Sequence, residues 1–296
     1  MDLQTALELV EADSQFRVLR RLPFPPVPPG GHLAESLVGV IVDVETTGLD
    51  QDIHEVIELG MIAFEFDRDG QIGSHFRVFR GFNEPSRPIP SEITRLTGIK
   101  DEDVRSQHIE QGEVDAFMAG AALVIAHNAA FDRPFAEALS PQFSSMPWAC
   151  TATEIDWAAE GVAGGRLEYI AMAFGCFYEA HRAVDDCNAV ANILTFRLPR
   201  SNRSTLSALL DAARRSEIRI FAVGAPYDLR IPLKRAGYRW NDGTNGYPRA
   251  WWKDVDGDDV AEETTFLRGF GSDLVDPSMF RMDARTRFRR GPSPRP

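Results

Sequence analysis

The sequence predicts an α/β protein whose larger domain contains a mixed β-sheet flanked by helices. Apolar runs at residues 38–44, 56–66 and 72–80 have strand character, and Asp69–Gly70 indicates a hairpin turn between the last two. A buried strand is expected at 123–126. Helical periodicity follows in three stretches, near 129–140, 166–175 and 183–197. Strands that alternate with helices are typical of one α/β domain, which we expect to end at about residue 200.

The sequence divides into four segments. Residues 1–36 contain a short amphipathic helix and a proline-rich linker, and residues 37–200 contain the α/β domain. Residues 201–284 are expected to form a small α+β accessory domain, with a helix near 204–214 and a strand at 218–223. The basic, proline-containing tail at 285–296 is expected to be disordered.

The composition excludes several classes of protein. A chain of 296 residues with 44% hydrophobic content can bury a substantial core. Its three cysteines provide no disulfide framework, and the acidic residues among the first twenty argue against a signal peptide. The longest apolar runs fall short of the roughly 18 residues that a membrane-spanning helix needs. We therefore expect a cytoplasmic protein with no membrane function.

The net charge of −12 is distributed unevenly along the chain. Residues 201–296 hold 17 Lys and Arg against 13 Asp and Glu, a net charge of +4. Residues 1–200 hold 15 against 31, a net charge of −16. Clustered carboxylates repel one another, and divalent cations in an active site would neutralise some of them. A solvated acidic surface explains most of the acidic residues in this part of the chain.

The first candidate site residues are Asp43 and Glu45, near the end of the strand at 38–44. Residues at i and i+2 of a strand share a face, so both carboxylates point to the same side. An acidic pair at a strand end is often only a solvated terminus or a turn. Here five of the six residues before Asp43 are apolar. Burial of an acid beside such a run is costly without a metal ion or a hydrogen-bond partner.

A second candidate group follows the strand at 123–126. Asn128 and Asp132 are four residues apart, so they share one face of a helix that starts near Asn128. The alternative is structural: Asn128 would cap the helix, and Asp132 would be a favourable acid in its first turn.

The third candidate group is His181 and Asp186. On one continuous helix their side chains would lie about 140° apart, so they converge only if the helix begins between them. In the alternative interpretation His181 lies on the surface, and Asp185 and Asp186 are capping acids.

Together the three groups closely resemble the DEDDh branch of the DnaQ-like exonuclease family. The matching runs are 43–48 (DVETTG), 127–132 (HNAAFD), and His181 with Asp186 five residues later. The segments 57–60 (IELG), 88–90 (PIP) and 97–99 (TGI) are also similar to the family. The resemblance covers about residues 38–198, and no residue of the three motifs departs from the family pattern.

The resemblance implies an RNase H-like fold, a five-stranded mixed sheet flanked by helices, and a site for two Mg²⁺ or Mn²⁺ ions. Asp43 would bridge the ions, Glu45 and Asp186 would complete one site, and Asp132 would hold the other. His181 would be the general base. In relatives, the positions of Thr46, Gly48 and Leu49 lie against the terminal nucleotide. The position of Asn128 lies near its sugar-phosphate backbone.

The expected activity is metal-dependent 3′-to-5′ removal of nucleotides from single-stranded or frayed DNA ends, for proofreading or repair, and a DNA polymerase is a candidate partner. An RNA exonuclease is the nearest alternative, since the motifs do not identify the sugar. A different alternative is a non-catalytic module on the same fold, which would be expected to have lost at least one metal ligand. In the accessory domain, the run from Lys234 through Arg239 and Trp240 to Trp252 suits either nucleic-acid contact or simple core packing.

Overall fold

The computed structural model describes residues 2–26, 33, 35–270 and 278–291. The chain forms two compact units, Met1–Ala212 and Ala213–Pro296. Within the described residues, no helix is long and apolar enough to cross a membrane.

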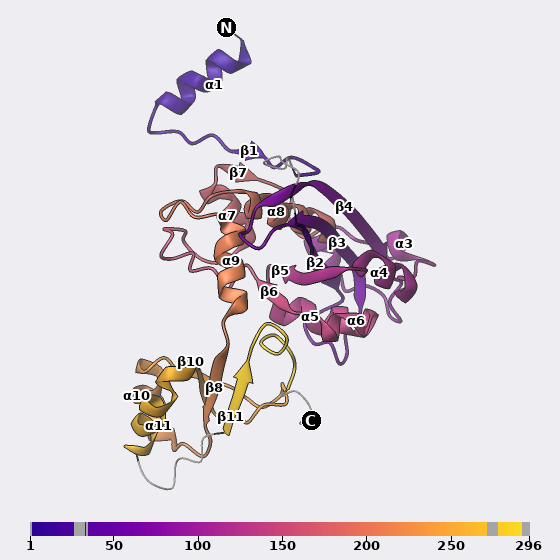
Figure 1. Ribbon diagram of the computed structural model, residues 1–296. Helices are drawn as coiled ribbons and strands as arrows, with labels where there is room; N and C mark the ends of the chain where they lie inside the picture. The colour runs from indigo at the N-terminus through magenta and orange to yellow at the C-terminus, as the bar shows by residue number, and fades with distance from the viewer. Residues whose placement is uncertain (1, 27–32, 34, 271–277, 292–296) are drawn as a thin grey trace. The chain divides into compact units, whose positions relative to one another are not determined.

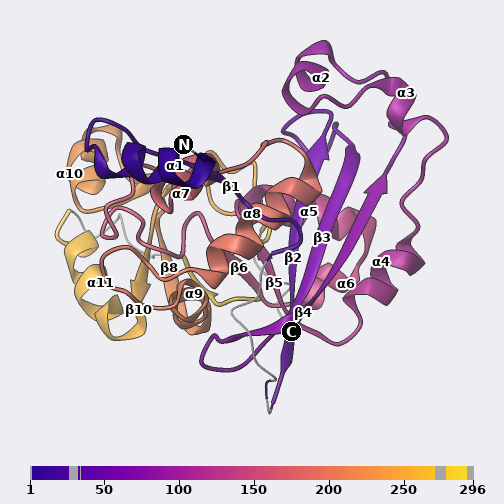
Figure 2. The same cartoon turned by 90° about the horizontal axis from the view of Figure 1, so that it is seen from above.

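The first unit is built on a five-stranded mixed sheet in the order β4-β3-β2-β5-β6. Strand β2 pairs antiparallel with β3 and parallel with β5, while β3–β4 is antiparallel and β5–β6 parallel (Figures 1 and 2). The strand bounds are β2 Leu37–Thr46, β3 Val56–Phe66, β4 Ile72–Phe82, β5 Ala121–Ala126 and β6 Trp148–Cys150. The predicted mixed α/β sheet is confirmed.

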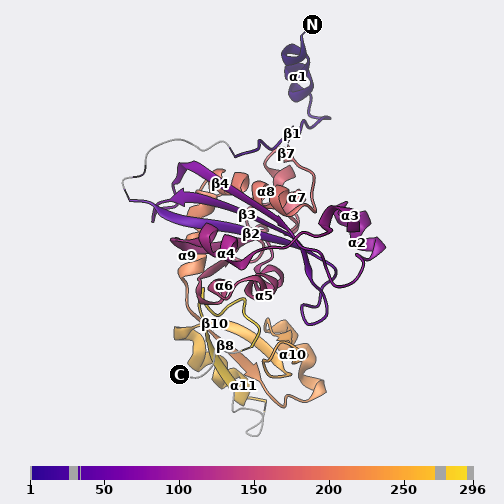
Figure 3. The same cartoon turned by 90° about the vertical axis from the view of Figure 1, so that its right-hand side faces the viewer.

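Helices cover both faces of this sheet. Helices α7 and α8 lie on one face, and α5 and α6 lie on the other (Figure 3). Because both faces are covered, the central strands are continuous apolar runs rather than alternating ones. The helix bounds are α1 Leu3–Ala12, α2 Ser91–Thr97, α3 Asp101–Val104, α4 Gln111–Met118, α5 Ala129–Leu139, α6 Gln142–Ser145, α7 Leu167–Ala173, α8 Ala183–Thr195 and α9 Thr205–Arg214.

Three short strands of the first unit were not predicted as segments: β6, and the pair β1 and β7. Strand β1 (Arg20–Arg21) pairs in parallel with β7 (Cys176–Phe177), so part of segment 1–36 belongs to the folded unit. The linker was predicted for the proline-rich residues that follow β1, so this pairing does not bear on that prediction. Of the predicted linker, residues 27–32 and 34 lie outside the described residues.

The second unit is a small antiparallel sheet in the order β11-β8-β10-β9. Its inner face packs Ile220, Leu233 and Val255 into a core. The bounds are β8 Glu217–Ala222, η1 Tyr227–Leu229, α10 Arg230–Arg235, β9 Arg239–Trp240, β10 Trp251–Asp256, η2 Gly257–Asp259, α11 Val260–Arg268 and β11 Ser278–Met282. This is the expected α+β arrangement.

The division between the units differs from the expected boundary at residue 200. The start of α9 is tied to the first unit, because the hydroxyl of Ser204 donates to the carbonyl of Gly70 at 3.2 Å and the amide of Thr205 donates to the carbonyl of Phe196 at 3.1 Å. The units therefore divide after Ala212, within the helix.

The tail is also more ordered than expected. The side chain of Arg287 donates to the carbonyl of Arg215 at 2.8 Å, and Phe288 is buried. The prediction of disorder is wrong for residues 285–291, and residues 292–296 lie outside the described part of the chain.

Gly60 on β3 sets the position of α8. A Cβ atom at this residue would lie 2.4 Å from the backbone carbon of Ala183 and 2.6 Å from the nitrogen of Val184. Real Cβ atoms do not approach backbone so closely, so only glycine lets the first turn of α8 lie directly on the sheet. The same turn carries Asp186.

We predict that Gly60→Ala lowers the free energy of unfolding by about 1–3 kcal/mol, because α8 must move away from β3. Urea denaturation followed by circular dichroism measures the change. The matched control is Gly112→Ala in α4, where a Cβ atom would meet nothing within 4 Å. Equal stability of the two variants would contradict the close-packing argument.

Candidate active site

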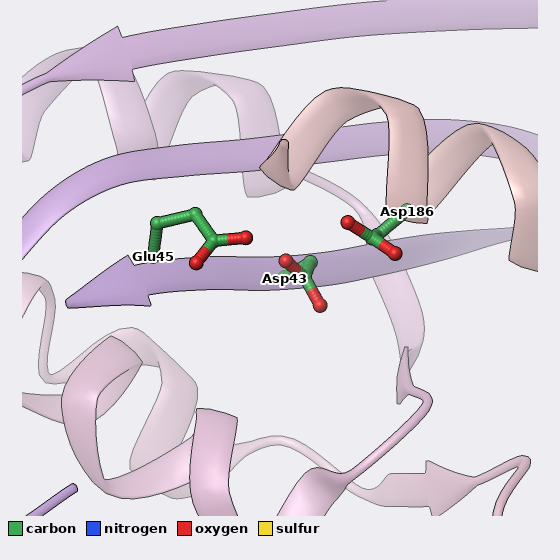
Figure 4. A group of neighbouring side chains, drawn as sticks. All are labelled: Asp43, Glu45 and Asp186. Carbon is green, nitrogen blue, oxygen red and sulfur yellow. The ribbon is translucent and has the colours of Figure 1, made fainter. Parts of the chain in front are cut away.

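Three carboxylates converge between β2 and α8. One oxygen from each of Asp43, Glu45 and Asp186 lies within 4.8 Å of the others. Asp43 and Glu45 come from the same face of β2, as the two-residue period predicts, and Asp186 reaches them from α8 (Figure 4). Carboxylate oxygens are the ligands that Mg²⁺ and Mn²⁺ prefer, so this donor set fits a divalent metal ion.

Asp132 approaches the same point from α5. Strand β5 pairs with β2 only as far as Ile41, which leaves the amide of Val44 without a partner from β5. The Oδ1 atom of Asp132 accepts a hydrogen bond from this amide at 3.2 Å. Asp132 is 2% exposed and is not one of the three converging acids. Of the neighbouring charges that raise the pKa of Asp43, however, that of Asp132 has the largest effect. The structure thus brings all four predicted acids to one end of β2.

The helix carrying Asp186 begins between His181 and Asp186, as their convergence requires. Helix α8 starts at Ala183, with Arg182 at the N-cap position. His181 precedes it with a left-handed backbone conformation, φ 67°. Burial raises the pKa of the Asp186 carboxyl, and the nearby charge of the half-buried His181 opposes this rise.

Both oxygens of Asp186 are held by hydrogen bonds. The hydroxyl of Tyr178 donates to Oδ1 at 2.7 Å, and the amide of Arg182 donates to Oδ2 at 3.1 Å. Burial, with the neighbouring negative charge of Asp186, raises the pKa of Tyr178, which keeps its hydroxyl protonated as a donor. Tyr178 thus orients the carboxylate.

Glu58 anchors the start of α8 from β3, directly opposite Glu45 in the strand pairing. Its side chain is fully buried and accepts hydrogen bonds from the amide of Ala183 and from Nε of Arg182, both at 3.2 Å. The guanidinium of Arg80 lies 3.1 Å away on the other side. A buried charge needs such partners. Glu58 therefore fixes the backbone next to His181.

Glu58, Arg182 and Tyr178 were not predicted as site residues. The one visible indication was a glutamate within the otherwise apolar run 56–64, since an acid in a central strand is costly unless it is paired. Neither Arg182 nor Tyr178 carried a pattern of its own.

The predicted substrate-contacting residues surround the end of β2 and the start of α5. The buried hydroxyl of Thr46 donates to the carbonyl of Gly48 at 2.6 Å. The side chain of Leu49 is 85% exposed. Asn128 is exposed and makes no capping hydrogen bond through its side chain, so the interpretation of its side chain as a helix cap is wrong.

In the second unit, the basic and aromatic run is divided between core and surface. Trp251 packs against the apolar core, whereas Trp240 contacts Trp251 edge-on and is 50% exposed. The guanidinium of Arg219 lies 4.0 Å from the ring centroid of Trp252, and that of Arg239 lies 5.5 Å away. Core packing therefore accounts for Trp251, while Trp240 and Arg239 remain open to solvent.

Burial and mutual repulsion make it unfavourable for all four acids to be ionised at once. Burial, followed by the charges of Asp132 and Asp186, raises the pKa of Asp43 well above its ordinary value. Burial raises the pKa of Glu45 and of Asp132 to about 8 in each case. It also raises the pKa of Asp186 to about 6, against the lowering effect of the bonds from Tyr178 and Arg182. A divalent cation would favour the ionised forms.

The RNase T family model, which describes an exonuclease, matches residues 40–194. The chain belongs to this exonuclease family. The matched segment begins within β2 and ends within α8, the elements that carry Asp43, Glu45 and Asp186.

Relatives of the exonuclease domain include bacterial proteins named as DNA polymerase III. DNA polymerase III subunit epsilon of Treponema pallidum is 31% identical over 171 residues, which cover 54% of this chain and 76% of that protein. DNA polymerase III PolC-type of Clostridium perfringens is 31% identical over 169 residues, which cover 53% of this chain. The match spans only 11% of that PolC-type protein.

A solved structure shows the same fold at lower sequence identity. E. coli Exonuclease I in complex with a dA16 oligonucleotide aligns with a TM-score of 0.50 and 13% identity, covering 78% of this chain and 68% of that one. The exonuclease domain therefore has the RNase H-like fold that the sequence motifs imply.

The raised pKa values predict how stability depends on pH without metal. Because the folded-state pKa values of Glu45 and Asp132 lie above their ordinary values, protonation favours the folded state. This contribution is complete below about pH 4 and is lost as the pH rises to about 8. In EDTA, Asp132→Asn should therefore become progressively more stable than wild type between pH 5 and pH 8, by up to about 1.4 kcal/mol per pH unit.

Urea denaturation at each pH measures this difference. The side-chain oxygen of asparagine can still accept the hydrogen bond from the Val44 amide, so the variant removes the charge and preserves this bond. Saturating Mn²⁺ should reverse the order of stability, since wild type then gains binding free energy. A difference that does not vary with pH would contradict the electrostatic account.

Proposed function

We propose that this protein is a divalent-metal-dependent 3′-to-5′ exonuclease that releases nucleoside 5′-monophosphates from DNA. The observation that carries the proposal is the convergence of Asp43, Glu45 and Asp186, with Asp132 beside them, at the end of β2 in a chain of the exonuclease family. A non-catalytic interaction module has no need of four costly buried carboxylates, and none of the four is lost.

Each side chain of the cluster has a distinct role in the proposed reaction. Asp43 lies centrally and would bridge two ions, while Glu45 and Asp186 would complete one ion's ligands and Asp132 would hold the second. Two hard cations would activate the attacking water and stabilise the departing 3′ oxygen. Mg²⁺ and Mn²⁺ both suit these oxygen donors.

His181 is the proposed general base. Its place on the loop before α8, next to Asp186, puts an imidazole at the edge of the carboxylate cluster. An imidazole can accept the proton of the attacking water near neutral pH. Residues on either side of His181 are held by hydrogen bonds. The hydroxyl of Tyr178 donates to Asp186, and the side chain of Arg182 donates to Glu58.

The residues proposed to hold the 3′-terminal nucleotide lie at the end of β2 or just after it, and immediately before α5, the elements that carry Glu45 and Asp132. The exposed Leu49 would lie against the base or sugar, with the backbone near Thr46 and Gly48 completing the contact. Asn128, exposed at the start of α5, would contact the sugar-phosphate backbone.

DNA with a single-stranded or frayed 3′ end is the proposed substrate. The names of the DNA polymerase III relatives support DNA, a role in proofreading or repair, and a polymerase as a candidate partner. RNA is the second candidate, because ribonuclease T of Haemophilus influenzae is 30% identical over 116 residues. The three unpaired cysteines support a reducing compartment, the cytoplasm.

One experiment separates these substrates. Matched single-stranded DNA and RNA oligonucleotides, labelled at the 5′ or the 3′ end, are incubated with Mg²⁺, Mn²⁺ or EDTA. We expect a ladder of shortened 5′-labelled DNA, immediate release of the 3′ label as a mononucleotide, and no reaction in EDTA. A higher kcat/KM on RNA than on DNA would make RNA the substrate.

We predict that Asp43→Ala lowers kcat by more than tenfold, a loss above about 1.4 kcal/mol in transition-state stabilisation, because the bridging ligand is removed. Steady-state degradation of labelled DNA measures the loss. The matched control is Asp185→Ala, which removes an acid from the same first turn of α8 but outside the converging cluster. Equal rates for the two variants would remove Asp43 from the proposed mechanism.

We predict that His181→Ala lowers kcat by about 10² to 10⁴ with little change in KM, since a general base acts only in the transition state. The acidic limb of the pH–rate profile should also change. His75→Ala, a change at a histidine whose side chain is 77% exposed, is the control. A small loss with an unchanged pH profile would place His181 outside the chemistry.

A further inference from the structure

The segment of residues 17–26, which we call the N-terminal strap, is docked along the loop that carries His181. Its backbone pairs with the segment around β7. The amide of Arg20 donates to the carbonyl of Gly175, and the amide of Leu22 donates to the carbonyl of Phe177, both at 2.9 Å. Strands β1 and β7 lie side by side in Figures 1 and 3. The strap lies upstream of residues 40–194, the part matched by the exonuclease family.

Side chains of the strap reinforce this pairing. Leu22 is 5% exposed, so the strap buries an apolar anchor. The guanidinium of Arg21 lies 3.0 Å from the carboxylate of Glu179 and 5.0 Å from the ring centroid of Phe177. The side chain of Arg17 donates to the carbonyl of Met172, at the end of α7.

The strap also binds α8 through one carbonyl group. The Nδ2 atoms of Asn188 and Asn192 donate to the carbonyl of Pro23 at 3.0 and 3.1 Å. Both asparagines are buried, at 4% and 2% exposure. Their positions four residues apart place them on one face of α8. Buried amides are costly when left without a partner, so this face of the helix is suited to the strap.

The strap therefore contacts both elements that flank the catalytic loop, β7 and α8. The loop runs from β7 through Tyr178, which orients Asp186, to His181 and then into α8. Strap residues bind β7 before the loop and α8 after it. When both flanking elements are held, the loop has fewer conformations in which its histidine points away from the carboxylates.

We propose that the N-terminal strap is a positioning element of the active site: it holds residues 178–182 so that His181 faces the carboxylate cluster. Leu22 is the main positioning residue, because its buried apolar side chain lies next to the residues that pair with β7. The kinetic part of this inference rests on the proposed exonuclease function. The structural part, ordering of the loop by the strap, does not.

The test compares three variants of the full chain. Leu22→Glu places a charge at the buried anchor and should release the strap. Leu22→Met keeps an apolar side chain of similar volume and should behave as wild type. The control Leu9→Glu makes the same change on α1, where the leucine is 61% exposed and no residue is buried. Amide hydrogen exchange and steady-state kinetics with Mn²⁺ are measured on each.

Leu22→Glu should increase exchange at residues 175–182 while strands β2–β4 stay protected. Its kcat should fall at least about tenfold with KM nearly unchanged, because misplacing a catalytic group acts on the transition state. Leu22→Met and Leu9→Glu should match wild type in both measurements. If Leu22→Glu does not fold, the double variant Asn188→Ala/Asn192→Ala removes the bonds to Pro23 and should show the same two effects.

Three outcomes would overturn the inference. Unchanged exchange at 175–182 would show that the strap does not order the loop. Faster exchange with an unchanged kcat would show that loop order is not needed for catalysis. A raised KM with unchanged kcat would make the strap a substrate contact. If wild type itself degrades no nucleic acid, the proposed function fails, while the exchange data still decide whether the strap orders the loop.

Discussion

The active site depends on holding four carboxylates together in a largely buried place. Asp43 and Glu45 come from one strand, and Asp132 and Asp186 reach them from two different helices. Their mutual repulsion and loss of hydration oppose this arrangement, as the raised pKa values show. The arrangement therefore depends on a rigid surrounding structure.

That rigidity comes from how α8 is attached to the sheet. Gly60 allows the backbone of α8 to contact β3. Glu58 accepts hydrogen bonds from the first amide of the helix and from the side chain of Arg182. Arg80 and Arg182 balance the buried charge of Glu58, so this acid belongs to the support of the site. Among the acids of the cluster, Asp132 instead accepts a hydrogen bond from a backbone amide, and Asp186 accepts one from Tyr178 and one from the amide of Arg182. These neutral donors leave the carboxylate charge available to cations.

The sequence predicted the parts of the structure that depend on local pattern. The bounds of β3 were correct because it is a long apolar strand between clear turns, and the convergence of His181 with Asp186 correctly required a helix start between them. The pairing of β1 with β7 could not be predicted. Each strand has two residues, too few for any periodicity, and contacts such as Arg21 with Glu179 join residues 158 positions apart. The support from Glu58 likewise depends on tertiary contacts.

Proton release on metal binding tests the central claim most directly. If burial and repulsion keep part of the carboxylate cluster protonated near neutral pH, binding of Mn²⁺ must expel those protons. Titration calorimetry at pH 7 in buffers of different ionisation enthalpy should show release of at least about one proton per chain, falling towards zero above pH 9. Binding of Mn²⁺ with no proton release at pH 7 would contradict this account.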